Sequence, residues 1–216
     1  MTLRSPRRVF RYAVLVAAII IAVPSLVLAQ DEPRATSPKP NKPPEPPGKL
    51  PKVGPDRTRG LDFLFGALKA APDEVSAKAV EAKIWAIWLQ TPSDTAALLM
   101  ARAKAAIDAQ QGDIALKLLD ATIKLRPDYV EAWNRRATLY YLRNDYGRSL
   151  ADIQQVLVRE PRHFGALAGL GMIMQDLGDD KRALEAFRKA LAVNPHLDKV
   201  PDLVKTLTEK VEGRDI

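Results

Sequence analysis

Three prolines, Pro127, Pro161 and Pro195, are spaced 34 residues apart, and the residue types between them repeat with the same period. A period of this length is typical of two antiparallel helices joined by a short turn. Such a hairpin cannot bury its apolar face alone, so successive hairpins stack on one another. Because proline cannot continue a helix, each second helix should end just before it. The period therefore predicts an all-α solenoid with repeats at 96–129, 130–163 and 164–197.

Small residues recur at the three repeat positions where paired helices should cross closely. Small side chains let two helix axes approach toward the low end of the roughly 8–10 Å range. Large residues at positions 4, 11 and 24 should then fill the grooves between the helices. The small residues are Ala103, Ala137 and Gly171 at position 8, Ala115, Ser149 and Ala183 at position 20, and Thr122, Val156 and Ala190 at position 27.

The second and third repeats share a pattern of residue types. The second contains Trp133-x2-Arg136-Ala137-x2-Tyr140, Ser149-x3-Ile153 and Pro161, and the third contains Leu167-x2-Leu170-Gly171-x2-Met174, Ala183-x3-Phe187 and Pro195. Both resemble the tetratricopeptide repeat (TPR) pattern W-x2-L-G-x2-Y, A-x3-F and P. The first repeat departs from it, since Gly112-Asp113 stands two positions later than the family's Gly-Asp turn. This shift predicts a longer first helix or a tighter turn.

Helical patterns continue on both sides of the three repeats. Residues 61–95 are interpreted as a degenerate repeat with a shortened first helix, in which Trp85 and Trp88 pack against the array. Pro201 suits the first turn of a final helix, and residues 198–212 are expected to cap the solenoid with a polar face. The folded domain, 61–216, should then contain about nine helices.

The first 29 residues read as a secretory signal peptide, because arginines precede an apolar run over 12–23 and Ala29 ends a suitable cleavage site. An uncleaved membrane anchor is the alternative. The pair Arg7-Arg8 leaves twin-arginine export open beside the general secretory route. We therefore expect an exported, periplasmic protein. Three fragments, 133–137, 161–167 and 212–216, also resemble small exported bacterial TPR proteins without an assigned function.

Residues 30–60 form a proline-rich segment that has too little apolar bulk to fold and is interpreted as a disordered tether. The net charge of +7 resides in the first 59 residues, which comprise the leader and most of this segment. The leader holds 4 basic and no acidic residues and the tract to residue 59 holds 7 and 4, which leaves 22 of each from 60 onward. A balanced solenoid disfavours nucleic-acid binding, whereas the basic tether could touch an anionic envelope surface.

The two histidines are the only groups in the sequence on which catalysis could be built. It has no cysteine, which excludes disulfides, thiol catalysis and Cys metal ligands. Its two histidines, His163 and His196, stand in loops between repeats and are interpreted as polar residues that cap the next helix rather than as a metal or acid–base pair. No phosphate loop, zinc-binding motif or nucleophile elbow is present. We expect no enzyme activity, cofactor or metal.

Resemblance to the TPR family implies a concave groove lined by positions 2, 5, 9 and 12 of each first helix. Such a groove would bind a protein or peptide, with apolar anchors for affinity and polar groups for register. Lys at position 5 with Asn at position 9, the family's carboxylate clamp, is not found in any repeat. Self-association in the cell envelope is the alternative, and the oligomeric state stays open. The groove candidates are Met100, Lys104, Ile107, Glu131, Asn134, Thr138, Tyr141, Met172 and Gln175.

Overall fold

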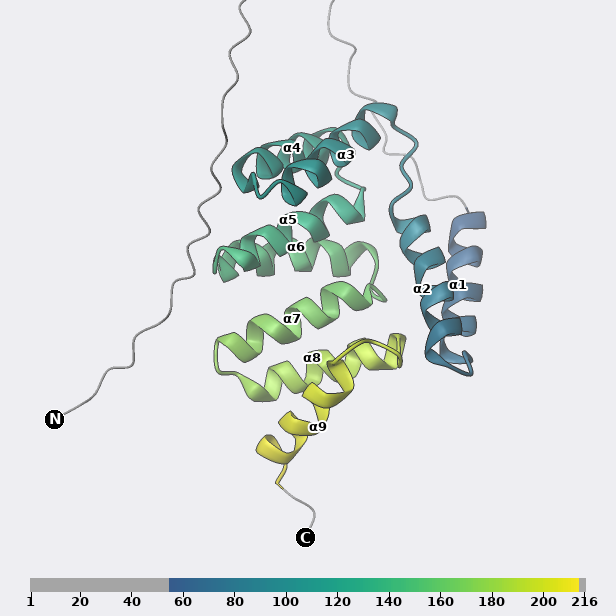
Figure 1. Ribbon diagram of the computed structural model, residues 1–216, viewed down its shortest axis with the longest axis vertical. Coiled ribbons are helices and arrows are strands. Elements are labelled where there is room, and N and C mark those ends of the chain that lie inside the picture. The colour runs from purple at the N-terminus through teal and green to yellow at the C-terminus, as the bar shows by residue number, and fades with distance from the viewer. Residues whose placement is uncertain (1–54, 214–216) are drawn as a thin grey trace, which may run out of the picture. The chain divides into compact units, whose positions relative to one another are not determined.

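The computed structural model describes residues 55–213, which contain nine α-helices and no strand (Figure 1). The expected signal peptide, 1–29, and most of the expected tether, 30–60, lie outside the described residues. Within the described part, the solenoid prediction is confirmed. The helices are α1 Pro55–Lys69, α2 Glu74–Trp88, α3 Asp94–Asp108, α4 Gly112–Leu125, α5 Val130–Leu142, α6 Tyr146–Arg159, α7 Phe164–Asp176, α8 Asp180–Val193 and α9 Val200–Val211.

The pairs α3–α4, α5–α6 and α7–α8 are three helical hairpins whose boundaries keep the 34-residue period. Their second helices start at 112, 146 and 180 and end at 125, 159 and 193. In each turn one residue adopts the left-handed conformation, at Gln110, Asn144 and Gly178 (φ 58°, 58° and 79°). All three turns therefore have the same length. The first repeat does have the longer first helix, but Gly112 begins α4 and is not the turn glycine.

Close helix crossing explains the small residues of the pattern. All nine small positions are buried. The closest approach is at Gly171 on α7, where a Cβ atom would lie 2.6 Å from the ring of Phe187 on α8. Ser149 is accommodated because its hydroxyl donates to the carbonyl oxygen of Ala137 at 2.8 Å. Packing and polar satisfaction are therefore both met at these crossings.

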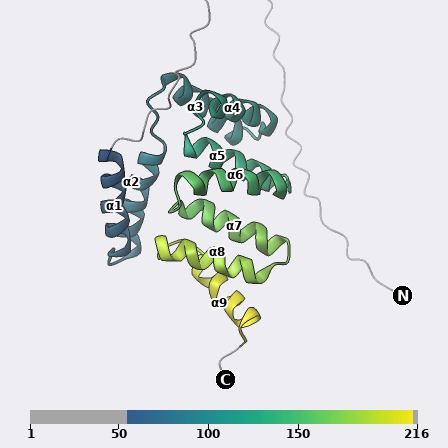
Figure 2. The ribbon, with the colours of Figure 1, turned by 180° about the vertical axis from the view of Figure 1, so that it is seen from behind.

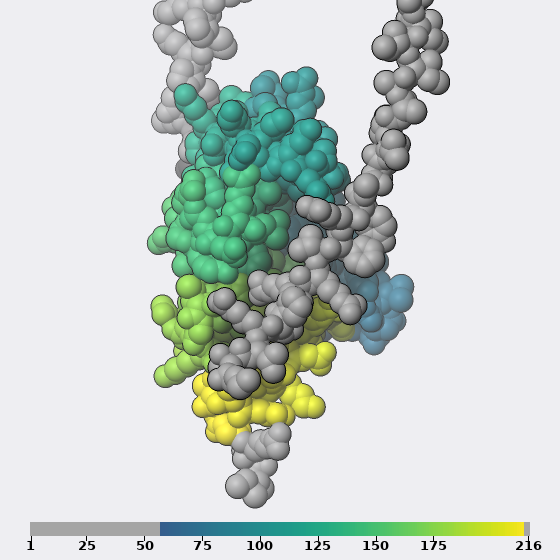
Figure 3. All heavy atoms as spheres, turned by 60° about the vertical axis from the view of Figure 1, so that its left-hand side comes forward, coloured from purple at the N-terminus to yellow at the C-terminus, as the bar shows by residue number. Residues whose placement is uncertain are grey.

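Neighbouring hairpins pack through the second helix of one and the first helix of the next, so α4 contacts α5 and α6 contacts α7. Figure 3 follows this succession from the teal to the yellow end of the described atoms. A polar link reinforces it, since Arg136 of α5 donates to Asp152 of α6 at 2.8 Å and to Asp120 of α4 at 2.7 Å. The side chain of Arg136 also lies 5.0 Å from the centre of the Trp133 ring. One arginine thus joins three consecutive helices.

The α1–α2 hairpin differs from the prediction in its start and in its first helix. α1 begins at Pro55, inside the segment expected to be a tether, and at 15 residues it is not shortened. Proline is well suited to the first turn of a helix. The side chain of Arg57 further ties this turn to the rest of the hairpin, because it donates to the carbonyl oxygen of Ile87 at 2.7 Å.

The hairpin packs along the edge of the array, against the loops that join the repeats (Figures 1 and 2). Leu61, Phe65, Leu68 and Trp88 form one buried cluster with Phe164, the first residue of α7. Residues of the loop after α8 add to it, and Asn194 there donates to Glu81 of α2 at 3.1 Å. The two tryptophans do pack against the array, as expected. The hairpin is nevertheless not a further layer of the stack.

The final helix, α9, packs against α8 and ends the array. It starts at Val200, one residue before Pro201, and Lys199 before it has a left-handed backbone (φ 60°). Leu207 is buried, while Arg188 of α8 binds both carboxylate oxygens of Glu212 at 2.6 and 2.9 Å. None of the helices in the described part is long and apolar enough to cross a membrane.

Candidate functional site

Positions 9 and 12 of the first helices form a row along α3, α5 and α7. All three residues at position 9 are exposed, and all three at position 12 are partly buried. The row combines two apolar side chains, one aromatic ring and three polar groups, with Met172 41 % exposed. Such a mixture suits the apolar anchors and polar groups of peptide recognition. The residues are Lys104, Thr138 and Met172 at position 9 and Ile107, Tyr141 and Gln175 at position 12.

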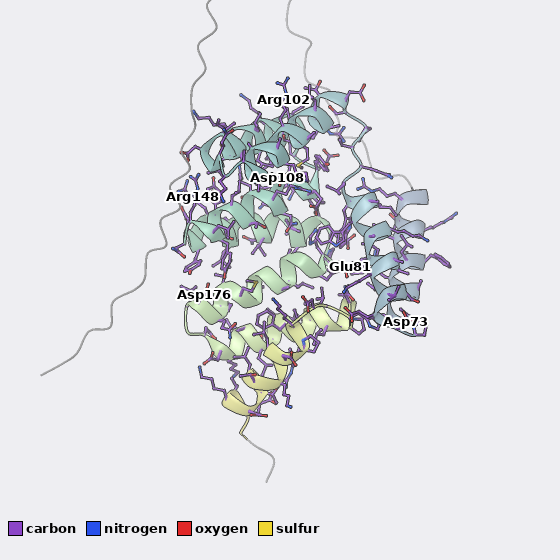
Figure 4. The ribbon with its side chains drawn as sticks, in the orientation of Figure 1. Asp73, Glu81, Arg102, Asp108, Arg148 and Asp176 are labelled. Atoms are coloured by element: carbon purple, nitrogen blue, oxygen red, sulfur yellow. The ribbon has the colours of Figure 1, made fainter. Side chains whose placement is uncertain are left out.

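Tyr141 stands at the centre of this row and belongs to a small polar and aromatic cluster. Its ring centre lies 6.0 Å from that of Tyr146, whose hydroxyl donates to the Asp176 carboxylate at 3.2 Å. Partial burial, followed by hydrogen bonding to Asp176, raises the pKa of Tyr141, so its hydroxyl stays protonated at neutral pH. Asp176 and Arg148 lie at the edge where the hairpins turn, far from Glu81 on α2 (Figure 4). The cluster is therefore remote from the α1–α2 hairpin.

Two of the predicted groove residues are not available to a partner. Met100 is 5 % exposed and packs in the core between α3 and α4. Glu131 is 1 % exposed and is enclosed near the hairpin edge. Both predictions were wrong for the same reason. The position of a residue within the repeat does not show which neighbouring residues bury its side chain. Asn134, a turn further along α5, is partly buried.

Glu131 is buried because it pairs with His163. Their Oε1 and Nε2 atoms lie 2.7 Å apart, and His163 is fully buried. The other ring nitrogen of His163, Nδ1, accepts from the backbone N–H of Ala166 at 3.0 Å and so caps α7. Nδ1 therefore carries no proton, and Nε2–H donates to the carboxylate. The prediction that His163 caps the next helix is confirmed.

The α2 tryptophans cover this pair. The ring of Trp88 stacks on His163 at 4.2 Å with an angle of 15°, and Trp85 meets it edge-on at 5.4 Å. Trp85 also lies against Gly165 at position 2 of the third repeat, where a Cβ atom would come within 3.0 Å of the ring. Trp85 therefore covers the start of α7, and Glu131 at the start of α5 is enclosed with His163, whereas the row at positions 9 and 12 stays open.

A comparison with known proteins gives this architecture its family. A TPR repeat-containing protein of Rhizobium etli is 40 % identical to this chain over 153 residues, which are 71 % of the chain and 75 % of the relative. The chain belongs to the tetratricopeptide repeat family. The tetratricopeptide repeat signature itself matches residues 100–151 and 164–197, and the second match coincides with the third repeat as read from the sequence.

Solved TPR structures share the fold at low sequence identity. The first TPR domain of Spaghetti (RPAP3), bound to the HSP90 peptide SRMEEVD, superposes with a TM-score of 0.53 at 13 % identity and covers 56 % of this chain and 97 % of its own. MamA superposes with a TM-score of 0.52 at 18 % identity over 74 % of this chain and 85 % of its own. The TPR fold is a protein–protein interaction module.

The two histidines of this TPR protein have different partners. His163 pairs with Glu131, whereas the backbone N–H of His196 donates to the side chain of Asn194 at 3.0 Å. No group of three or more His, Asp or Glu side chains in the described range could hold a metal ion. His163 therefore serves the start of α7. The prediction that His196 caps the next helix was wrong, because Lys199 is the N-cap of α9 and no side chain caps that helix.

A second concave feature was not predicted from the repeat positions. A cavity of about 410 Å³ lies where α1 and the end of α2 meet two inter-repeat loops. Its lining combines residues that are far apart in the sequence, such as Arg57, Trp88 and Arg159. The only sequence signal that could have indicated it is the arginine that flanks each of the first two repeat prolines, Arg126 and Arg162.

Proposed function

We propose that the protein is a non-catalytic TPR adaptor that binds a protein or peptide along the open row of its concave face. The observation that supports this most directly is the succession of exposed position-9 side chains on three adjacent helices, Lys104, Thr138 and Met172. Half-buried Tyr141 beside them is a rigid aromatic anchor of the kind that dominates binding energy at interfaces. The α5 and α7 parts of the row adjoin each other, because these two helices are in direct contact.

The charges and the buried residues along the row favour a peptide with both apolar and polar side chains over an acidic peptide. Lys104 is the one basic side chain of the row, and Asp108 lies 2.5 Å from it, so the row has no cluster of positive charge for an acidic peptide. Met100, at position 5, cannot act as a clamp residue. The RPAP3 domain binds an HSP90 peptide that ends in EEVD. In this chain we propose that Tyr141 and Met172 hold apolar side chains of the partner, with Thr138 and Gln175 as hydrogen-bonding groups.

A non-catalytic role is consistent with the only buried histidine in the described residues. Both ring nitrogens of His163 are engaged, one with Glu131 and one with the backbone of Ala166. The ring lies under Trp88 and has no exposed surface. A histidine in this environment has no access to a substrate and no free nitrogen for proton transfer.

Site-specific photo-crosslinking in the native cell tests the groove. One probe replaces Tyr141, and a control probe replaces Lys117, which is exposed on the outer helix α4. A discrete adduct from position 141 alone supports the proposal and identifies the partner by mass spectrometry. Met172→Glu should abolish that adduct, while Val158→Glu, at a residue 72 % exposed on α6, should leave it unchanged.

Self-association is the second candidate function, and one surface favours it. Leu150, Leu157 and Val158 of α6 border a shallow apolar depression together with Leu170 of α7. Self-crosslinks from both probe positions, together with a mass that increases with protein concentration in light scattering, would favour this function over the adaptor.

We further propose that the protein is exported and that its leader is removed after Ala29. N-terminal sequencing of the exported form should then begin at Gln30, and a mature chain that begins at Met1 would contradict the proposal. Replacing Arg7 and Arg8 by lysine separates the two export routes, because only the twin-arginine route requires the arginine pair.

A further inference from the structure

The cavity beside the α1–α2 hairpin has the size and construction of a small-ligand site. Its volume of about 410 Å³ falls in the range of ligand pockets, roughly 300–1,000 Å³. Leu61, Trp88 and Tyr129 contribute buried side chains to its lining, at 5, 2 and 5 % exposure. Exposed residues such as Thr58 and Gln90 form its rim. The cavity therefore has an apolar floor and a polar opening.

Positive charge dominates the lining. Four arginines stand against two carboxylates, Asp128 and Glu160. Arg126 donates to both oxygens of Asp128, at 2.9 and 2.6 Å, and this pairing holds the pKa of Asp128 below its usual value. Arg162 donates to Asp62 at 2.6 Å and to Glu160 at 3.4 Å. These two arginines are neutralised by carboxylates.

The other two arginines, Arg57 and Arg159, have no carboxylate within ion-pair distance among the described residues. Arg57 donates to the carbonyl oxygen of Ile87 at 2.7 Å. Arg159 donates to the carbonyl oxygen of Pro127 at 2.9 Å and to Gln155. Arg159 also lies 5.2 Å from the centre of the Trp133 ring, and its charge contributes to the lowered pKa of Asp128. Each guanidinium has five N–H donors, so both retain donors for a ligand. The lining thus carries an excess of two positive charges, or of one when Asp62 is included.

Two further polar features lie at the same cavity. The indole N–H of Trp88 has no hydrogen-bond partner in the described part of the chain, although the side chain is buried. Val130, the first residue of α5, also belongs to the lining, and α5 has no side-chain cap. Uncapped N–H groups at a helix start favour negative charge. The indole N–H of Trp88 adds a buried donor, whereas the start of α5 contributes the positive end of its dipole beside Glu131 of its own first turn.

We propose that this cavity binds an oxyanion, a carboxylate or phosphate carried on a small apolar or aromatic body. Arg57 and Arg159 hold the charged group, since guanidinium matches the geometry of both oxyanions. Leu61, Trp88 and Tyr129 contact the apolar body. The site is distinct from the concave row at positions 9 and 12, and it does not depend on the proposed adaptor function. The ligand is either a free small molecule or the C-terminal residue of a polypeptide.

Two-dimensional ¹H–¹⁵N NMR titration of the full chain tests the proposal with defined probes. Benzoate and phenyl phosphate should shift the Trp88 indole signal and bind at least about tenfold more tightly than uncharged benzamide, as expected for one charge-assisted hydrogen bond. Arg57→Gln and Arg159→Gln should each lower the affinity for both anions about tenfold. Arg182→Gln, at an exposed arginine of α8 outside the cavity, should change neither affinity.

A peptide pair distinguishes the two sources of the ligand. Acetyl-Gly-Gly-Phe with a free C-terminus should bind, and its C-terminal amide should not, if the site takes a chain end; binding of benzoate alone assigns it to a free small molecule. Equal affinity for benzoate and benzamide, or anion affinities that both arginine variants leave intact, would overturn the proposal. Thr58→Glu places a negative charge at the exposed rim and must also lower the affinity for the anions. This variant keeps the test decisive if an arginine variant fails to fold.

Discussion

The contact between Gly171 and Phe187 allows the close-packing argument to be tested quantitatively. A Cβ atom added at Gly171 would lie 2.6 Å from Cδ1 and Cε1 and 2.8 Å from Cζ of the ring. Carbon atoms prefer a separation of about 3.5–4.0 Å, so α7 and the ring must separate by roughly 1 Å. Phe187 has no exposed surface into which it could move. Gly171→Ala should therefore strain the α7–α8 crossing.

The magnitude follows from two opposing effects. Overpacking of a core costs about 1–3 kcal/mol, whereas replacing glycine by alanine inside a helix gains up to about 1 kcal/mol. We expect a net loss of about 1–2 kcal/mol in the free energy of unfolding. For a domain of this size that corresponds to a fall in Tm of about 2–8 °C. Thermal unfolding followed by circular dichroism measures it directly.

Gly169→Ala on the same helix is the matched control. Its added Cβ would meet only the Cδ1 atom of Ile153, at an ordinary 3.7 Å, so this variant should be as stable as the wild type or more stable. The first repeat indicates which second substitution could relieve the strain, because at the positions of Gly171 and Phe187 it has Ala103 and Leu119. Adding Phe187→Leu to Gly171→Ala should recover part of the loss, with a coupling energy of about 0.5–3 kcal/mol. A Gly171→Ala variant at least as stable as Gly169→Ala would refute the reasoning.

Three further predictions concern other parts of the array. Glu131→Ala leaves the buried N–H of His163 without an acceptor and should lower the free energy of unfolding by about 1–3 kcal/mol in urea titrations, whereas Glu131→Gln, which keeps an acceptor oxygen, should cost less. Hydrogen bonds from the backbone N–H and then the side chain of Arg182 lower the pKa of Asp179 below 3.8. The ionised Asp179 therefore stabilises the folded protein above about pH 4, and this contribution is lost as the pH falls through the lowered pKa. Between pH 5 and 2, the Tm of Asp179→Asn should fall less than that of the wild type. Gln110→Gly relieves a left-handed backbone and should raise the Tm slightly in thermal unfolding followed by circular dichroism, and an unchanged or lower Tm would contradict this.

The repeat architecture could be predicted from the sequence because each requirement recurs every 34 residues. Pro127 and Pro161 mark where second helices end, and the small residues mark where helices cross. The same spacing could have revealed the buried pair, since Glu131 and His163 stand at the start and end of one repeat and adjacent loops bring those ends together. The true turn of the first repeat was missed because Gln110, and not a glycine, adopts the left-handed conformation there.

The place of the α1–α2 hairpin could not be predicted from the period, because its contacts join residues that are distant in sequence. Trp88 meets His163 across 75 positions, and Arg162 pairs with Asp62 across 100. Neither pair falls at a multiple of the repeat. The consequences for function come from this packing. It closes the groove at Glu131, and it creates the arginine-lined cavity.

The same packing explains the unusual surface of the first repeat. In a regular array the preceding hairpin covers positions 3 and 10 of the next first helix, and Ala132 and Leu139 on α5 are accordingly buried. On α3 the equivalent residues, Leu98 and Ala105, are exposed, because α2 makes no comparable packing against α3 in the described residues. Arg102 lies between them in sequence and is also exposed (Figure 4). Ala105 and Arg102 give the small and charged surface that a solenoid end needs to stay soluble, whereas Leu98 leaves an apolar side chain 53 % exposed. The first TPR is thus the N-terminal end of the stack, and the α1–α2 hairpin packs on the array from the side.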